Sequence, residues 1–283
     1  MMRRAWLSAA AGVLAGGWAI WRAFRTEPAR LTVSEHRLSF PPESGVPPQV
    51  RIAHLTDLHL RGWGPAEQAA ARAISRADPD LVVFTGDYIE HLSALPLLTP
   101  VLKQLCRGRP AYAVLGDNDD AGWLKASELV HRLSAADVEV LRNEARLVRT
   151  AGGSIWLVGV DDPHSGRARL DLALRGVPQR REGRPPVVLL AHSPEIVADP
   201  RATEADLILV GHTHGGQICL PGWGPIVTNS RLGRRYARGR RMLGQSLVYT
   251  NRGLGMARIP ARFACPPELA LFSIGAKPPG VSP

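Results

Sequence analysis

Residues 206–214 read DLILVGHTH, and this stretch decides the interpretation of the whole chain. Its apolar run, 207–210, is typical of a strand buried on both faces. Two histidines, His212 and His214, follow Gly211 with one residue between them. On an extended segment such residues point the same way, so both imidazoles could bind one metal ion. The stretch predicts a buried strand that ends at a metal site.

The same arrangement, an apolar run that ends in polar residues, recurs along the chain. Strands that are apolar throughout indicate sheets covered on both sides. We expect strands in the runs VRIAHLTD (50–57), DLVVFTGD (80–87), AYAVLGDND (111–119), SIWLVGVDD (154–162), PVVLLAHS (186–193) and DLILVGHTH (206–214), and further strands in SLVYTNRG (246–253) and LALFSI (269–274).

Amphipathic helices are expected between the early strands, at 66–77, 95–105 and 122–135. Alternation of strands and helices predicts a layered α/β fold. In such folds ligands bind beyond the carboxyl ends of the strands. Metal-capable side chains follow the runs at that edge, which makes a shared site there the simplest interpretation. They are Asp57, His59, Asp87, Asp117, His192, His212 and His214.

Carboxylates mixed with imidazoles fit Mn, Fe or Zn better than Ca or Mg alone. The three cysteines, Cys106, Cys219 and Cys265, are widely spaced and form no CxxC pair, which argues against a structural zinc site. We therefore expect a divalent metal centre. Asp87 has two carboxylate oxygens and could bridge two ions.

The N-terminus carries the uncharged run AWLSAAAGVLAGGWAIW (5–21), flanked by arginines on both sides. Its length is at the lower limit for a bilayer span, and tryptophans near its ends favour the membrane interface. We expect residues 1–25 to be a retained single-pass anchor rather than a cleaved signal peptide. Residues 2–8, MRRAWLS, partly match a twin-arginine export signal, so export is favoured although the membrane side stays open.

Residues 26–48 are polar and rich in proline, which predicts a connector or an edge hairpin before a catalytic domain at 49–283. The formal net charge is +10, which favours anionic partners. Segment 231–241 contributes to it with six arginines, a residue that grips phosphates or rests on acidic lipid headgroups. A solvated loop would explain this segment equally well.

The order DxH, GD, GDND, H and GHTH resembles the calcineurin-like metallophosphoesterases, and more narrowly their bacterial membrane-anchored branch. The resemblance covers nearly all of 26–275. It implies a four-layer α-β-β-α sandwich preceded by the N-terminal transmembrane helix. It also implies hydrolysis of a phosphodiester, phosphomonoester or pyrophosphate bond by a metal-bridging hydroxide. One ion would be held by Asp57, His59, Asp87 and His214, and the other by Asp87, Asp117, His192 and His212.

The sequence departs from the family pattern Gly-Asn-His-Asp, because residues 116–119 read Gly-Asp-Asn-Asp. Asp117 in place of asparagine should tighten ion binding and weaken attraction for a phosphate anion. Asn118 replaces the histidine thought to protonate the leaving group, and asparagine donates a hydrogen bond without transferring a proton. With Asn118 and Asp87 as the catalytic residues, the substrate should have a good leaving group, as a pyrophosphate linkage provides.

An anchored enzyme with many arginines suggests a phosphorylated, lipid-linked or cell-envelope substrate, such as UDP-2,3-diacylglucosamine, and no nucleic acid. That reaction faces the cytoplasm, which conflicts with export. Two alternatives stay open. A zinc amidohydrolase would also use Asp and His at strand ends, although its HxH usually comes early in the chain. Asn118 leaves room for a weakly active or non-catalytic metal-binding scaffold at the membrane.

Overall fold

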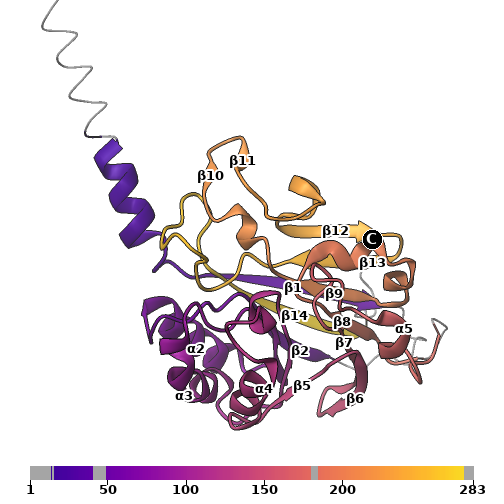
Figure 1. Ribbon diagram of the computed structural model, residues 1–283. Coiled ribbons are helices and arrows are strands. Elements are labelled where there is room, and N and C mark those ends of the chain that lie inside the picture. The colour runs from indigo at the N-terminus through magenta and orange to yellow at the C-terminus, as the bar shows by residue number, and fades with distance from the viewer. Residues whose placement is uncertain (1–13, 15, 41–48, 180–183, 277–283) are drawn as a thin grey trace, which may run out of the picture.

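The structure is a computed structural model that describes residues 14, 16–40, 49–179 and 184–276. Two six-stranded sheets form its centre (Figure 1). The first sheet has the order β1 (Thr32–Phe40), β14 (Glu268–Ala276), β2 (Val50–Leu55), β3 (Leu81–Thr85), β4 (Ala111–Val114), β5 (Val138–Val140). Strands β2 to β5 run parallel, and β14 runs antiparallel to β2.

The second sheet has the order β12 (Gly239–Leu243), β13 (Ser246–Thr250), β9 (Leu207–Val210), β8 (Val187–Leu190), β7 (Gly153–Gly159), β6 (Glu144–Thr150). Its four inner strands are parallel, and the two outer ones pair antiparallel. A small hairpin of β10 (Cys219–Leu220) and β11 (Gly224–Pro225) stands apart from both sheets.

Three separate apolar clusters show how the layers stack. One lies between the two sheets and includes Val83 and Leu209. Another packs the first sheet against α2 (Pro65–Ala77), α3 (Leu95–Cys106) and α4 (Ala126–Ser134). The last packs the second sheet against α5 (Leu170–Ala173) and short 3₁₀ turns near Ile196 and Ala202. The order is therefore helices, sheet, sheet, helices, as expected for strands buried on both faces.

Helix α2 shows how local sequence sets these elements. Pro65 occupies the first helical turn, and the Glu67 carboxylate accepts a hydrogen bond from Gly64 N at 2.9 Å. Alanines and Ile74 form the buried face against the sheet. The helix ends at Asp78, which adopts left-handed backbone with φ 46°. The three predicted helices are thus present, although α4 begins at Ala126 rather than at 122.

The sequence predicts a connector or an edge hairpin at 26–48, and the structure has an edge strand of the first sheet there, β1. This nine-residue strand pairs in parallel register with β14 along its whole length. Exposure alternates along residues 32–39, as in a strand with one covered face. Polar residues on both faces of β1 hide this alternation in the sequence. Residues 41–48, which contain four of the prolines, lie outside the described residues.

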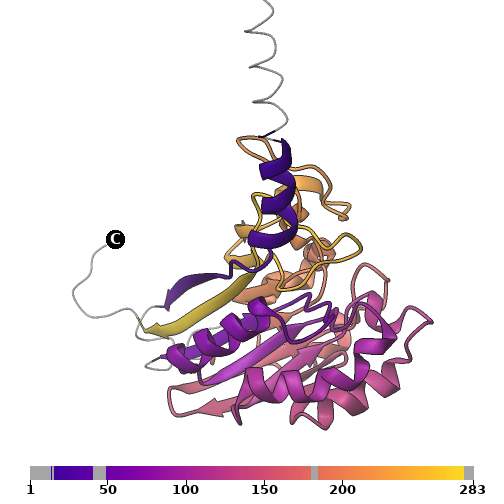
Figure 2. The same cartoon turned by 90° about the vertical axis from the view of Figure 1, so that its left-hand side faces the viewer.

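The predicted transmembrane helix is only partly covered, because residues 1–13 and 15 lie outside the described residues. Helical residues 16–26 project away from the sheets (Figures 1 and 2). In the part of the chain that the structure describes, no helix combines the length and apolar character needed to cross a bilayer.

Candidate metal centre

Each of the predicted metal-binding residues lies in a loop directly after a buried strand. The loops follow β2, β3, β4, β8 and β9, which bring residues from both sheets to one edge of the sandwich. The structure places the seven side chains together in groups able to hold metal ions. They are Asp57, His59, Asp87, Asp117, His192, His212 and His214.

Asp57, His59 and His214 form the first group, with one ligand atom each within 4.8 Å of the others. Nε2 of His59 lies 3.2 Å from Nε2 of His214. Nε2 of His214 lies 3.4 Å from Oδ1 of Asp57. Two ring nitrogens and a carboxylate oxygen thus face a common point, from the loops after β2 and β9.

Asp117, His192 and His212 form the second group. Asp117 Oδ1 lies 3.0 Å from His192 Nε2 and 2.9 Å from His212 Nδ1. The two imidazoles approach each other to 3.2 Å between the same nitrogens. This group comes from β4, β8 and β9, so it joins both sheets.

Asp87 lies between the two groups. Its Oδ2 is 3.2 Å from Nε2 of His59, and its Oδ1 is 3.5 Å from Nε2 of His192. The carboxylate is 2% exposed, which leaves it almost no contact with water. One oxygen therefore faces each group, the arrangement that a bridging ligand requires.

Hydrogen bonds fix which nitrogen of three histidines faces the centre. His192 Nδ1 contacts the Thr85 carbonyl oxygen at 2.6 Å, and His212 Nε2 contacts the Asn229 carbonyl oxygen at 2.9 Å. Nδ1 of His59 contacts the Glu90 carboxylate at 2.7 Å. A carbonyl or carboxylate only accepts, so these nitrogens always carry a proton, and the opposite ring nitrogen is the one that can bind metal once any proton on it is displaced.

The ligand loops are not extended, which corrects the geometry expected from alternation in DxH and HxH. Five of the seven residues have left-handed backbone: Asp57 (φ 49°), His59 (37°), Asp87 (57°), His212 (67°) and His214 (52°). Such backbone is strained for residues with a Cβ atom, and strain of this kind gathers at functional sites. The strands end at Leu55 and Val210, so tight turns rather than strand pleats aim the side chains.

Two glycines make room for this packing. At Gly86, with φ 93°, an added Cβ would lie 2.6 Å from Nδ1 of His192 and 2.6 Å from Gly116 N. At Gly116 an added Cβ would collide with Oδ1 of Asp87. The GD and GDND motifs therefore need glycine because the loops after β3 and β4 are in contact.

Asn118 lines the site beside Asp87. Its Nδ2 donates a hydrogen bond to Oδ2 of Asp87 at 2.6 Å, and its backbone N lies 3.2 Å from Oδ1. Asp119 is buried behind it and accepts from Asp87 N at 2.8 Å and Gly116 N at 2.7 Å. Burial and the charge of Asp87 raise the pKa of Asp119 to about 7. Asp119 thus shapes the loop, whereas Asn118 borders the open groove.

Electrostatics couple the buried groups. Burial alone would lower the pKa of His59, but hydrogen bonds to Asp87 and Glu90 outweigh it and raise the pKa to about 10. Burial raises the pKa of Asp57, opposed by the charge on His192. Burial alone would raise the pKa of Asp117, but hydrogen bonds to His192 and His212 outweigh burial and hold this pKa well below the usual range. Without metal, protons on the imidazoles balance the carboxylates.

Sequence reasoning missed Glu90 and Asn229, which orient His59 and His212. Neither belongs to a recognisable motif, although Glu90 follows Asp87 at a spacing of three. His164, to which no role was assigned, lies with its ring centroid 4.8 Å from that of His212. Its Nδ1 is 3.8 Å from Glu195 Oε1 and has no hydrogen-bond partner among the described residues.

Other residues behave as structural groups. His54 is fully buried and shares a 2.8 Å hydrogen bond with Thr85 Oγ1, and burial lowers its pKa to about 3. Asp161 pairs with Arg142 at 2.9 Å, and Asp162 accepts from Ser165 N at 2.7 Å. These contacts make the two aspartates turn-forming residues.

The donor set fits two divalent ions. Oδ1 of Asp57 and Nδ1 of His214 are buried without a hydrogen-bond partner among the described residues. A buried carboxylate oxygen without a partner is costly, and a cation at the first group would satisfy it. The Nε2 atoms of His59 and His214, 3.2 Å apart, can both bind a cation at the first group once the proton on His59 is displaced. Asp and His groups that can bind two metal ions are therefore present; the metal is not identified.

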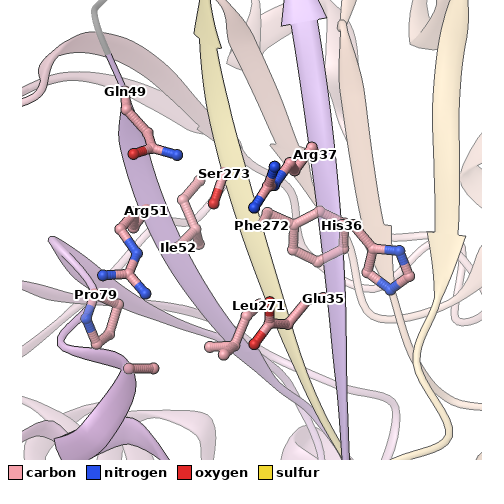
Figure 3. Close-up of a pocket in the computed structure, with 11 residues that line it drawn as sticks. Glu35, His36, Arg37, Gln49, Arg51, Ile52, Pro79, Leu271, Phe272 and Ser273 are labelled. Carbon is pink, nitrogen blue, oxygen red and sulfur yellow. The ribbon is translucent and has the colours of Figure 1, made fainter.

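A groove of about 420 Å³ leads from the surface to these groups. Its floor includes His59, Asp87 and Asp117, while Ile226 and Ile259 belong to its wall. A second hollow of about 230 Å³ lies on β1, β14 and β2, beside His36 and Arg51 (Figure 3). It includes the start of β2, whereas the metal-binding groups lie beyond the end of that strand. The two hollows are thus separate.

An α/β sandwich whose strand ends carry two Asp/His groups defines a class of protein, the dinuclear metal-dependent hydrolases. Comparison with known proteins narrows the class. The family model described as "Calcineurin-like phosphoesterase" matches residues 50–216. The chain therefore belongs to the calcineurin-like phosphoesterase family, which confirms the resemblance to that family and makes the protein a phosphoesterase. The amidohydrolase alternative is excluded.

Three relatives are similar over most of the chain. The "Uncharacterized metallophosphoesterase YkuE" of Bacillus subtilis is 31% identical over 94% of this chain and 93% of its own length. The "Phosphodiesterase YaeI" of Escherichia coli is 30% identical over 96% of this chain and 98% of its own length. The "Transmembrane protein with metallophosphoesterase domain" of Danio rerio is 29% identical over 78% of this chain and 52% of its own length.

Proposed function

We propose that this phosphoesterase hydrolyses a phosphodiester or pyrophosphate bond in an anionic, lipid-linked substrate at a membrane. The observation that carries the proposal is Asp87, whose two oxygens face separate Asp/His groups. Two divalent ions held there supply the Lewis acidity that activates water and neutralises phosphoryl charge. Mn, Fe and Zn remain the candidates, because the ligands mix carboxylates with imidazoles.

The residues of this chain hold and orient the reacting groups. Three acceptors hold a proton on the outer ring nitrogen of a histidine: the Glu90 carboxylate for His59, and the carbonyl oxygens of Thr85 and Asn229 for His192 and His212. The inner nitrogens are therefore the ones that can bind metal. Strained turns bring the ligands into place before substrate arrives, which lowers the cost of reorganisation. Asn118 offers an amide N–H at the groove.

Asn118 also limits the substrate. No proton can be transferred usefully from an amide, so a leaving group that is stable as an anion is favoured. A nucleoside monophosphate leaving from a pyrophosphate linkage has this property. UDP-2,3-diacylglucosamine combines such a linkage with a lipid and is the candidate for a domain that faces the cytoplasm, whereas an exported domain requires another lipid-linked diester or pyrophosphate. The name "phosphodiesterase" of the Escherichia coli relative also supports a diester over a monoester.

The membrane location rests on the N-terminus. Residues 5–21 carry no charge and are flanked by arginines. The Danio rerio relative is named as a transmembrane protein, which supports the same placement. We propose a single-pass N-terminal anchor, with the catalytic domain exported.

The test is turnover of bis(p-nitrophenyl) phosphate by the full chain, after removal of metals and after addition of Mn²⁺. We expect no turnover without metal and restored turnover with Mn²⁺. Asp87→Asn should abolish turnover and the binding of one metal equivalent. Asp171→Asn, at a partly exposed position on α5, serves as the control. Turnover that survives both metal removal and Asp87→Asn would refute the proposed chemistry.

A further inference from the structure

Exposed large apolar side chains gather on two segments of the molecule. Among the described residues there are sixteen of them, and ten fall on these two segments, which is too many for scattered surface positions. One segment is helical: Leu14, Trp18, Ile20, Trp21 and Phe24. The other comprises the β10–β11 hairpin, the residues after it, and one loop: Leu220, Trp223, Ile226, Val227 and Ile259.

The end of the helical segment lies beside the second segment. Both the N-terminal helix and the β10–β11 hairpin extend from the same end of the molecule in both views (Figures 1 and 2). Arg262 N donates to the Ala23 carbonyl at 2.9 Å, and the Arg22 guanidinium lies 5.4 Å from the ring centre of Phe263. Leu14, Trp18, Ile20 and Trp21 belong to the proposed anchor at 5–21. We call Phe24, Phe263 and the apolar residues of the second segment the interfacial face.

Residues 207–267 carry charge of one sign, with nine arginines and no aspartate or glutamate. Among these arginines Arg262 is fully buried and Arg252 is paired with Glu268. The Arg234 guanidinium stacks over Trp223 with 3.6 Å to the ring centre, and Arg22 lies 5.4 Å from that of Trp18. Tryptophan beside arginine is typical of the boundary between hydrocarbon and headgroups, where the ring is half immersed and the cation meets phosphate.

The groove to the metal centre opens at this face. Ile226, Val227 and Ile259 are members of both the interfacial face and the groove wall. Val227 is 67% exposed, so an apolar surface leads directly from solvent towards Asp117 and His59. A water-soluble phosphoester would gain nothing from such a wall, whereas an acyl or alkyl chain would be desolvated by it.

We propose that the interfacial face rests on the surface of an anionic lipid bilayer and admits a phosphodiester-bearing lipid directly from that bilayer into the groove. This inference rests on the proposed function and adds the docking surface and the tail-binding wall. It differs from anchoring, since the anchor only tethers the domain, whereas the face fixes its orientation. Arginine provides the charge complement to anionic headgroups.

Docking is tested by a readout that needs no catalysis. The full chain is reconstituted in phosphatidylcholine–phosphatidylglycerol vesicles, with or without brominated phosphatidylcholine. The difference in quenching between the protein and Trp223→Phe reports the contact of Trp223 with lipid. We expect strong quenching that falls in Arg234→Gln and in vesicles without phosphatidylglycerol. Absence of any quenching of Trp223 would overturn the docking surface, whatever the enzyme hydrolyses.

Substrate entry is tested with two diesters that share one leaving group, hexadecyl p-nitrophenyl phosphate in vesicles and methyl p-nitrophenyl phosphate in water. We expect kcat/KM to favour the hexadecyl ester by about tenfold or more, since many methylenes become buried. The double variant Leu220→Ser/Trp223→Ser should reduce that ratio. Leu97→Ser, which alters an exposed leucine on α3 away from the interfacial face, should not.

Thermal unfolding of each variant checks that the change leaves the fold intact. A ratio near one in the unaltered protein, or a ratio that the double variant retains, would refute entry from the bilayer. Failure to hydrolyse either ester would instead contradict the proposed function, while the quenching result would stand by itself. In a competition experiment, a lysate protein that displaces the vesicles from the interfacial face would show that the face binds a protein rather than lipid. This result would also refute the inference.

Discussion

Asn118 is the residue that most clearly separates this site from the family pattern. Its side-chain amide donates a 2.6 Å hydrogen bond to Asp87 and borders the groove through which a leaving group would pass. An imidazole at that place could deliver a proton, and an amide cannot. The identity of one side chain therefore sets the range of leaving groups.

Asn118→His should raise kcat/KM for diesters with alkyl leaving groups by about 10²-fold, since general acids contribute on this scale. For p-nitrophenyl leaving groups the gain should be small, because the departing phenolate needs no proton. The measurement is a series of esters with graded leaving-group pKa. Asn118→Gln, which keeps an amide, is the control; a gain there, or a uniform gain across the series, contradicts the role assigned to residue 118.

The protonation of His59 is coupled to metal binding. Its pKa in the metal-free protein is about 10, so at about pH 8 it carries a proton that metal must displace. We expect metal binding to release that proton and metal affinity to fall as the pH is lowered. Calorimetry in buffers of different ionisation enthalpy measures the release. The favourable contribution of His59 to metal-free stability is present below its unfolded pKa, about 6.5, and is lost as the pH rises through about 10.

Glu90→Gln tests whether the Glu90 carboxylate raises the pKa of His59. Loss of this carboxylate should lower the pKa of His59, reduce proton release and weaken metal binding by about 10–100-fold. Glu128→Gln, at an exposed pair on α4, is the control. Equal proton release in both variants would show that Glu90 does not govern His59.

At the scale of elements, the loop 252–265 depends on one buried cation. Arg262 is fully buried, and its guanidinium donates to the carbonyl oxygens of Arg252, Gly253, Gly255 and Cys265 at 2.5–3.1 Å. The loop includes Ile259 of the groove wall and contacts the N-terminal helix. A single side chain thus replaces the regular hydrogen bonds that a strand would provide.

Arg262→Met should lower the free energy of unfolding by about 3 kcal/mol or more, because several buried carbonyls lose their donor. Hydrogen exchange should increase first within residues 252–265. Urea unfolding and amide exchange measure the two effects. Arg72→Met, at an exposed position on α2, is the control, and an equal loss there would contradict the role of Arg262.

Sequence predicted the elements that are locally encoded and missed those that depend on distant partners. Apolar runs such as 81–85 and 207–210 specify their strands, because burial on both faces leaves only one interpretation. β1 was predicted only within a connector or an edge hairpin, because its stability comes from pairing with β14, more than two hundred residues later in the chain. The ligand residues were recognised by type and order, but their left-handed turns and the roles of Glu90 and Asn229 depend on neighbours from other loops.

At the scale of the whole molecule, metal should join the two halves of the sandwich. The second ligand group contains Asp117 from the first sheet and His192 from the second. We expect metal removal to lower the melting temperature and metal excess to add about 4 kcal/mol at a concentration 1,000 times Kd. Calorimetry with and without chelator measures the shift, and Asp117→Asn should reduce it. An unchanged melting temperature would show that the two halves are held together without the ions.

The left-handed backbone at five ligand positions affects how any mutational scan of this centre is read. Alanine at Asp57 or His214 removes a donor atom and also keeps a Cβ atom in a costly conformation. Glycine removes the same donor but relaxes the chain, so the pair of substitutions separates loss of coordination from release of torsional energy. A glycine variant that is more thermostable than its alanine counterpart, yet equally inactive, would reveal how much stability this enzyme gives up to keep its centre assembled.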